Sequence, residues 1–241
     1  MRLTRIFENS TITLNDTVRL SDNSAQHIRT VLRLKLNDEM VLFNGDGCNY
    51  KAKITQLDKR EVFVQITDIE KRNTLSPLRI HLGQALCRGE KMDFVIQKAT
   101  ELGVQAITPL ITEYSNVKLI DDRLEKKQAH WQNVADSAAE QSGRTDRLII
   151  HSAKDILEWF KLPFDGLRLV LEPNSPSSIK SLKKHDSVQL LIGPEGGLSE
   201  QEIKQALSDK FTAITLGPRI LRTETAALTI SSILQCLWGD I

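Results

Sequence analysis

The stretch LLIGPEGGLSE, residues 190–200, decides the fold class of this chain together with LGPRILRTETA, residues 216–226. In each stretch a glycine-and-proline loop follows an apolar, strand-like run and leads directly into a helical pattern. Glycine permits positive φ and a close approach of the backbone, and proline stiffens a turn. Two such loops at the carboxyl ends of neighbouring strands would form a crevice, the usual ligand site of open α/β sheets.

The first loop differs from the loops that bind phosphates. No Lys-Ser or Lys-Thr follows its last glycine, and its glycines lack the spacing of a dinucleotide site, so a phosphate-rich cofactor is not indicated. Spacing alone leaves open that both loops are structural turns. Ser199 and Glu202 form a capping box that needs no functional explanation, but capping does not account for three nearby glycines.

From Leu78 onward, strand and helix patterns alternate, which predicts a parallel sheet with helices on its faces. The expected strands are 79–85, 106–110, 148–151, 167–172, 188–192 and 213–216, and the expected helices are 91–102, 123–139 and 223–238. The periodicity of 91–102 places Phe94 on the buried side. Residues 1–72 read as short strands around one helical stretch, 24–32, which suggests a small barrel. A polar segment ending at Pro77 places the domain boundary between 1–72 and 73–241.

The composition is that of an ordinary globular protein, with 241 residues, 40% hydrophobic and 26% charged. No apolar run has the length of a membrane helix, and the first residues lack a signal-peptide core. Cys48, Cys87 and Cys236 are far apart, and the histidines are scattered, so we expect a cytoplasmic protein with no metal site. The net charge of +1 implies that RNA binding would depend on a local basic patch.

The paired loops resemble one family. The segment IGPEGGLSEQE (192–202), followed by LGPRILRTETAAL (216–228), is similar to the bacterial 16S (small-subunit) ribosomal RNA uridine-N3 methyltransferases. Other segments that resemble the family are HIRTVLRLKL (27–36), FNGDG (43–47), KMDFVIQKATELG (91–103) and AEQSGR (139–144). The resemblance therefore spans nearly the whole chain.

The resemblance implies a fold of the SPOUT class, an α/β parallel sheet whose C-terminal part forms a trefoil knot around S-adenosylmethionine. It also implies that residues 1–72 form a PUA-like β-barrel that binds RNA. The implied activity is methylation of uridine N3, with S-adenosylmethionine as the donor. The implied partners are small-subunit ribosomal RNA or the assembled small subunit, and a second copy of the chain, because the family's cofactor pocket lies at a dimer interface. Neither a metal nor a membrane is expected.

Arg222 and Glu195 are the candidate catalytic residues. Methyl transfer is an in-line displacement that depends on orientation, and the imide proton of uridine must leave. The Arg222 guanidinium can stabilise charge on a uracil oxygen, with a salt bridge or phosphate contact as its alternative. Glu195 can accept the proton or hold a polar group of the donor.

The candidate cofactor-binding residues lie in the two loops and at the end of strand 167–172. They are Leu171, Glu172, Ile192, Gly193, Pro194, Glu195, Gly196, Gly197, Leu216, Gly217, Ile220, Leu221, Arg222, Thr223 and Thr225. Thr223 is expected at the N-cap of the helix, with a contact to the cofactor as its other role. An exposed loop acid is the alternative for Glu172.

Six basic residues are candidate RNA contacts, of the phosphate-binding kind that positions RNA without reading its sequence. Arg29 and Arg33 are four apart, which would place them on one helix face, and Lys35 follows closely. The others are Arg5, Lys91 and Lys98. A solvated charged face is the alternative.

Two other functions remain open. One is a SPOUT methyltransferase that acts on another RNA or another base atom, and the other is a non-catalytic RNA-binding or ribosome-assembly module. The intact glycine loops favour an enzyme. A nucleotide-binding phosphotransferase is disfavoured, because the phosphate-cradling lysine is absent.

Overall fold

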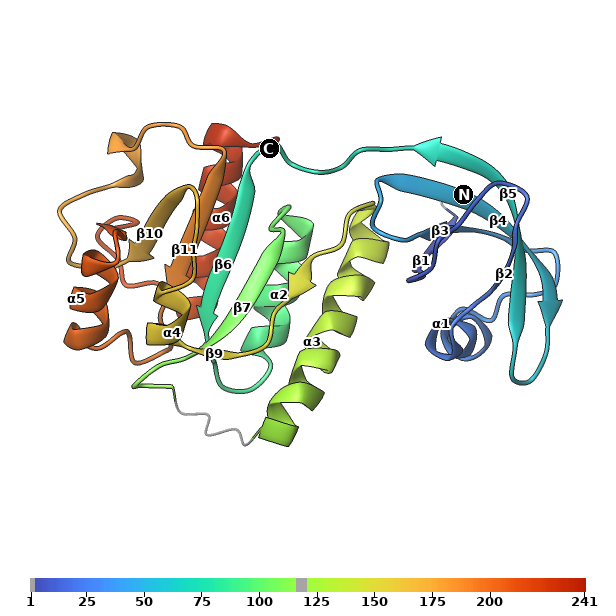
Figure 1. Cartoon of the computed structure of the whole chain (residues 1–241), viewed down its shortest axis with the longest axis horizontal. Coiled ribbons are helices and arrows are strands. Elements are labelled where there is room, and N and C mark those ends of the chain that lie inside the picture. Colours follow the sequence, from blue (N-terminus) through green and yellow to red (C-terminus); the bar gives the residue numbers. More distant parts are fainter. Residues whose placement is uncertain (1–2, 116–120) are drawn as a thin grey trace. The chain divides into compact units, whose positions relative to one another are not determined.

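The computed structural model describes residues 3–115 and 121–241. The chain divides into two compact units, shown in Figure 1. The first contains the chain up to Leu75 together with residues 136–147, and the second contains Ser76–Ala135 and Leu148–Ile241. The sequence places all of 73–241 in one domain, so the grouping of 136–147 with the first unit is a departure from that expectation.

The first unit is built on a mixed sheet with the strand order β1-β3-β4-β5-β2. Its strands are β1 (Thr4–Phe7), β2 (Thr17–Arg19), β3 (Glu39–Phe43), β4 (Cys48–Leu57) and β5 (Val62–Lys71). β1 and β3 are parallel, and the other pairs are antiparallel. Among the described residues β1 and β2 do not pair with each other, so the strands form an open sheet rather than the hydrogen-bonded closed barrel that the sequence suggests.

The helical stretch of this unit changes type along its length. The helix α1 (Asp22–Gln26) begins after Ser21, whose side chain accepts a hydrogen bond from the Ser24 N–H, and it continues as the π-helical segment η1 (His27–Leu32). Arg33 ends this segment in the left-handed conformation, with φ 53°. Arg33 therefore lies beyond the last helical residue, and the four-residue spacing does not place it with Arg29 on one helix face.

The AEQSGR segment has a structural role in the first unit. The Arg5 guanidinium is buried, donates hydrogen bonds to the Asn49 side chain and to the Arg144 carbonyl oxygen, the latter at 2.7 Å, and lies 4.7 Å from the ring centroid of Phe43. Glu140 Oε1 accepts a hydrogen bond from the Phe7 N–H at 3.0 Å. Arg5 is thus occupied inside the unit, which corrects its assignment as an RNA contact.

Glu140 makes the stability of the chain depend on pH. Its pKa is raised to about 7, mainly by burial and to a smaller extent by Asp136, while the hydrogen bond from Phe7 and the charge of Arg5 lower it. Because the folded state binds the proton more tightly than the unfolded state, this stability is present at low pH and is lost as pH rises through about 7. We expect Glu140→Gln, whose amide oxygen can still accept from Phe7, to gain stability relative to the wild type between about pH 5 and 8. Thermal unfolding at both pH values measures this, and an equal difference at both would refute it.

The second unit is a parallel sheet with the strand order β12-β10-β11-β6-β7-β8. Its strands are β6 (Arg79–Ala85), β7 (Ala106–Ile111), β8 (Ile149–Ile150), β9 (Lys154–Asp155), which also pairs with β7, β10 (Leu167–Leu171), β11 (Ser187–Ile192) and β12 (Thr212–Ile214). Its helices are α2 (Lys91–Glu101), α3 (Asp121–Ser142, which the first unit shares), α4 (Ile156–Phe160), the 3-10 helix η2 (Ile179–Ser181), α5 (Glu200–Ser208) and α6 (Thr223–Trp238). The alternating pattern from Leu78 onward therefore predicts the fold class correctly.

Helices cover both faces of this sheet, which buries every residue of β11. On one face, Leu190 packs in a core with residues of α2 and α6, and on the other, Leu191 packs with residues of α4 and α5. Gly83 allows the second packing, because a Cβ atom there would lie 2.3 Å from the Trp159 ring. Phe94 is 46% exposed, so its predicted burial is wrong; α2 instead buries Met92, Val95, Ile96, Ala99 and Thr100.

Candidate functional site

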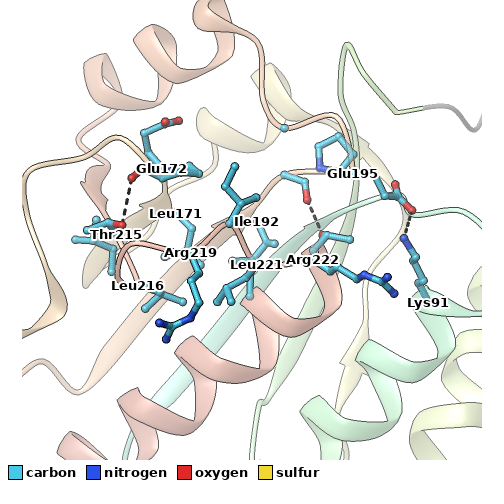
Figure 2. Close-up of a pocket in the computed structure, with 18 residues that line it drawn as sticks. Lys91, Leu171, Glu172, Ile192, Glu195, Thr215, Leu216, Arg219, Leu221 and Arg222 are labelled. Carbon is cyan, nitrogen blue, oxygen red and sulfur yellow. Dashed lines mark hydrogen bonds and ion pairs between the residues drawn. The ribbon is translucent and has the colours of Figure 1, made fainter.

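A cavity of about 440 Å³ lies at the carboxyl ends of β10, β11 and β12, and Figure 2 shows the side chains around it. The predicted cofactor residues that line it are Leu171, Glu172, Ile192, Gly193, Pro194, Glu195, Gly197, Leu216, Ile220, Leu221, Arg222 and Thr223. The lining residues that the sequence analysis did not assign to the cofactor are Lys91, Pro173, Ile214, Thr215, Arg219 and Ala226. The loops 192–197 and 216–223 thus meet at one cavity.

Three predicted cofactor residues do not line the cavity. Gly196 faces Tyr114, because a Cβ atom on Gly196 would lie 3.1 Å from Tyr114 Cβ. Gly217 has φ +102°, so its glycine is needed for the turn, and Thr225 is exposed in the first turn of α6. The two glycines are therefore explained by a side-chain contact and by a turn, and the Thr225 side chain is directed to solvent.

The first loop owes its shape to its own backbone. The Gly197 N–H donates to the Pro194 carbonyl oxygen at 3.0 Å, and Gly197 has φ +77°. A Cβ atom on Gly193 would lie 3.2 Å from the backbone carbon of Gly197, which cannot move without opening the turn. The capping box of Ser199 and Glu202 then begins α5. The tight fold of the loop therefore requires glycine at positions 193 and 197.

Thr223 joins the two loops. Its hydroxyl donates to the Gly193 carbonyl oxygen at 2.6 Å and accepts a hydrogen bond from Gln84 Nε2 at 3.0 Å. Arg222, and not Thr223, occupies the N-cap position of α6, so the predicted N-cap role of Thr223 is wrong. The hydroxyl instead ties the start of α6 to the first loop and to β6.

An ion pair closes one side of the cavity. Lys91 Nζ lies 2.8 Å from Glu195 Oε1 and 3.8 Å from Glu224 Oε2, and the Arg88 N–H also donates to Glu195 at 3.2 Å. Burial raises the pKa of Glu195, but the hydrogen bonds from Lys91 and from backbone N–H groups outweigh it, so the net pKa lies below the ordinary value. The hydrogen bond with Glu195 raises the pKa of Lys91. Glu195 is therefore ionised near neutral pH and is a weak proton acceptor.

Two arginines of the second loop are exposed at the cavity. The side chains of Arg219 and Arg222 form no hydrogen bond or ion pair with any residue in 3–115 and 121–241. Figure 2 shows them extending in different directions, with Arg222 directed toward the side of Lys91. The neighbouring Ile220 is 87% exposed. This loop thus offers two unpaired guanidinium groups to a ligand.

The remaining RNA candidates have mixed surroundings. Arg33 and Lys35 are exposed in the first unit, whereas Arg29 Nη1 donates to the Asp58 carbonyl oxygen at 2.9 Å. In the second unit, Lys98 pairs with Glu101 at 2.8 Å. Lys91 lines the cavity, where it pairs with Glu195 at 2.8 Å, so its amino group is occupied and is not a free phosphate contact.

The part of the chain that the structure describes holds no group of three or more His, Cys, Asp and Glu side chains suited to a metal ion. None of its helices has both the length and the apolar character needed to cross a membrane. Burial raises the pKa of Cys87 to about 11, so its thiol stays protonated near neutral pH.

Two families of protein domains match the chain. An RNA methyltransferase domain matches residues 74–235, and an RNA methyltransferase PUA domain matches residues 20–67. The first match contains both cavity loops. The second includes the exposed basic residues Arg33 and Lys35.

Curated relatives align with almost the whole chain. Ribosomal RNA small subunit methyltransferase E of Buchnera aphidicola subsp. Schizaphis graminum is 37% identical over 100% of this chain and 98% of its own length. The protein of the same name from Bacillus subtilis is 32% identical, with 93% of each chain covered.

Solved structures show the same architecture. A methyltransferase of Legionella pneumophila, in complex with bound S-adenosylmethionine, has a TM-score of 0.97 and 38% identity over 100% of both chains. Ribosomal RNA small subunit methyltransferase E of Neisseria gonorrhoeae, bound to S-adenosylmethionine, has a TM-score of 0.92 and 36% identity, again over both whole chains.

Proposed function

The chain belongs to the ribosomal RNA small subunit methyltransferase E family, and we propose that it transfers a methyl group from S-adenosylmethionine to N3 of a uridine in 16S (small-subunit) ribosomal RNA. The observation that supports this most strongly is the cavity at the carboxyl ends of β10, β11 and β12, where both glycine loops meet. A non-catalytic RNA-binding role would not require a cavity with this lining.

The cavity fits S-adenosylmethionine. Its volume of about 440 Å³ lies within the usual range of small-molecule sites. Leu171, Leu216 and Leu221 would supply apolar surface for the adenine, and the backbone of 216–222 would supply polar groups for its edge. Glu172, which also lines the cavity, would accept hydrogen bonds from hydroxyl groups of the ribose. Arg219 and the Lys91–Glu195 pair add charged groups for the polar end of the donor.

The bound donor would supply an electrophilic methyl group. The protein's contribution is to orient the uridine and to favour loss of its imide proton. The Arg222 guanidinium has no ion-pair partner in 3–115 and 121–241, and it would stabilise the negative charge that develops on a uracil oxygen as N3 loses its proton. Glu195 is a weak base, so its role is to fix Lys91 at the cavity, and the proton is lost to solvent. The rate is then expected to rise with pH.

The fold and assembly of the family are proposed for this chain as well. The residues that follow β10 contact the end of β12: the Thr215 N–H donates to the Ser177 carbonyl oxygen at 2.9 Å, and Ser175 Oγ donates to the Ala213 carbonyl oxygen at 2.8 Å. These contacts between a connecting segment and the strand before the second loop support a SPOUT-type trefoil knot. The first unit would bind ribosomal RNA through Arg33 and Lys35, in the cytoplasm.

A homodimer is supported by exposed apolar side chains in the second loop and in the last residues of the chain. Ile220, Leu237 and Ile241 are 87%, 53% and 62% exposed. We expect light scattering to give the mass of two chains, and Leu237→Asp to shift the protein toward the monomer, because a charge in an apolar interface is costly to bury. Leu207→Asp, at a position 48% exposed on α5, is the matched control. A monomeric wild type, or equal effects of the two variants, would contradict the dimer.

Methyl transfer from labelled donor tests the proposed activity. We expect labelling of ribosomal RNA when purified small subunits that lack the modification are incubated with the protein, and comparison with free 16S RNA identifies which of the two is the substrate. The absence of label from both, in the presence of measurable donor binding, would favour the non-catalytic alternative.

A further inference from the structure

We propose that Tyr114 stacks on the acceptor base and holds it at the mouth of the donor cavity. This inference rests on the proposed function and names the residue that positions its nucleotide substrate. Tyr114 follows β7, whose carboxyl end lies at the same edge of the parallel sheet as those of β10 and β11. It is 47% exposed, and its hydroxyl forms no hydrogen bond with the residues 3–115 and 121–241.

The position of Tyr114 relative to the cavity follows from Gly196. A Cβ atom on Gly196 would lie 3.1 Å from Tyr114 Cβ, 3.7 Å from Cγ and 3.9 Å from Cδ2, so the tyrosine side chain covers this glycine. The residues on either side of Gly196, Glu195 and Gly197, both line the cavity. Tyr114 therefore packs on the loop at a glycine whose two neighbours in the chain both line the cavity.

The backbone around Tyr114 is held in place. The Glu113 N–H donates to Glu202 Oε1 at 2.8 Å, which ties it to the capping box of α5. The Ser115 N–H donates to the Thr112 carbonyl oxygen at 3.0 Å, and the Thr112 N–H donates to Ser115 Oγ at 3.2 Å. These bonds close a turn of four residues with Tyr114 inside it. The aromatic ring is thus presented from a fixed turn.

The chemistry of the reaction requires such a ring. N3 of uridine lies on the Watson–Crick edge, so an enzyme reaches it only when the base is unpaired and unstacked. Proteins hold unstacked bases by stacking them on aromatic side chains, which is worth about 1–3 kcal/mol per base in alanine substitutions. Within residues 3–115 and 121–241, the Tyr114 hydroxyl forms no hydrogen bond, so burial or anchoring of the hydroxyl does not explain the residue. A base stacked on this ring would lie next to the loop of Glu195 and within reach of the cavity.

Three variants separate stacking from packing. Tyr114→Phe keeps the ring, Tyr114→Leu keeps apolar contact with Gly196 without a flat face, and Tyr114→Ala removes both. We expect Leu and Ala to lower single-turnover methylation of small subunits at subsaturating RNA by about tenfold or more, and Phe to stay within about twofold of the wild type. Donor affinity by calorimetry and the thermal unfolding midpoint should be unchanged in all three, because Tyr114 does not line the cavity.

The outcomes distinguish the inference from the function on which it rests. An inactive wild type would refute the proposed function. An active wild type with equally active Leu and Ala variants would overturn the stacking role alone. The same holds if Phe is as impaired as Ala, or if donor affinity falls in parallel with activity, since both results indicate a role other than stacking.

Discussion

Arg222→Ala is expected to lower the maximal single-turnover rate of methyl transfer by about 10²–10³-fold, the usual cost of removing one group that stabilises a developing oxyanion. Donor affinity and RNA affinity should change far less, because the guanidinium acts on charge that appears only in the transition state. Arg222→Lys keeps the charge but loses the planar fork, so its rate should fall between those of alanine and the wild type. Rapid-quench measurement with labelled donor gives these rates.

Arg219→Ala is the matched control for Arg222. Both arginines are exposed in the same loop, and neither is paired within the described part of the chain. Because the two side chains extend in different directions, removal of Arg219 should affect donor affinity more than the rate at saturation. If Arg222→Ala weakens RNA binding and leaves the single-turnover rate unchanged, Arg222 is a phosphate contact and the proton must be handled elsewhere.

Gly193→Val is expected to weaken donor binding by about 100-fold or more, a loss of roughly 3 kcal/mol. A side chain at Gly193 would meet the backbone of Gly197 and Leu198, at 3.2 Å in each case, and would open the turn that forms the cavity wall. It would also disturb the carbonyl group that accepts the Thr223 hydroxyl. Calorimetric titration with S-adenosylmethionine measures the loss, and circular dichroism reports whether the fold persists.

Gly196→Ala provides the comparison within the same loop. Its Cβ atom would meet the side chain of Tyr114, which can shift by a few tenths of an ångström, and Gly196 does not line the cavity. Donor affinity should therefore stay close to that of the wild type. Equal loss of binding in the two variants would mean that the loop tolerates no side chain at all, and unchanged binding in Gly193→Val would place the donor elsewhere.

The loops were predictable because their signals are local. Glycine and proline restrict the backbone within a few residues, and the capping box of Ser199 and Glu202 is set by a spacing of three. The alternation of strands and helices likewise follows from short-range periodicity. The strand order does not, because β11 inserts between β10 and β6 through connections that no local pattern specifies.

The contacts that complete the site join distant parts of the chain. Lys91 pairs with Glu195 across 104 positions, and Gln84 bonds Thr223 across 139, so neither partnership has a sequence signature. Arg5 shows the same limit, since a basic residue on a strand reads as a surface contact until its partners Asn49 and Arg144 are known. The place of Arg219 at the cavity could have been predicted, because this residue lies within the second glycine-and-proline loop, 216–226.

The identity of the methylated nucleoside tests the central claim most directly. Small subunits that lack the modification would be incubated with the protein and isotopically labelled S-adenosylmethionine, and their RNA digested to nucleosides and analysed by mass spectrometry against authentic standards. The proposed function predicts that the label appears in 3-methyluridine and that Arg222→Ala nearly abolishes it. Label in a different methylated nucleoside, or in none while the donor binds, would contradict the assignment of uridine N3.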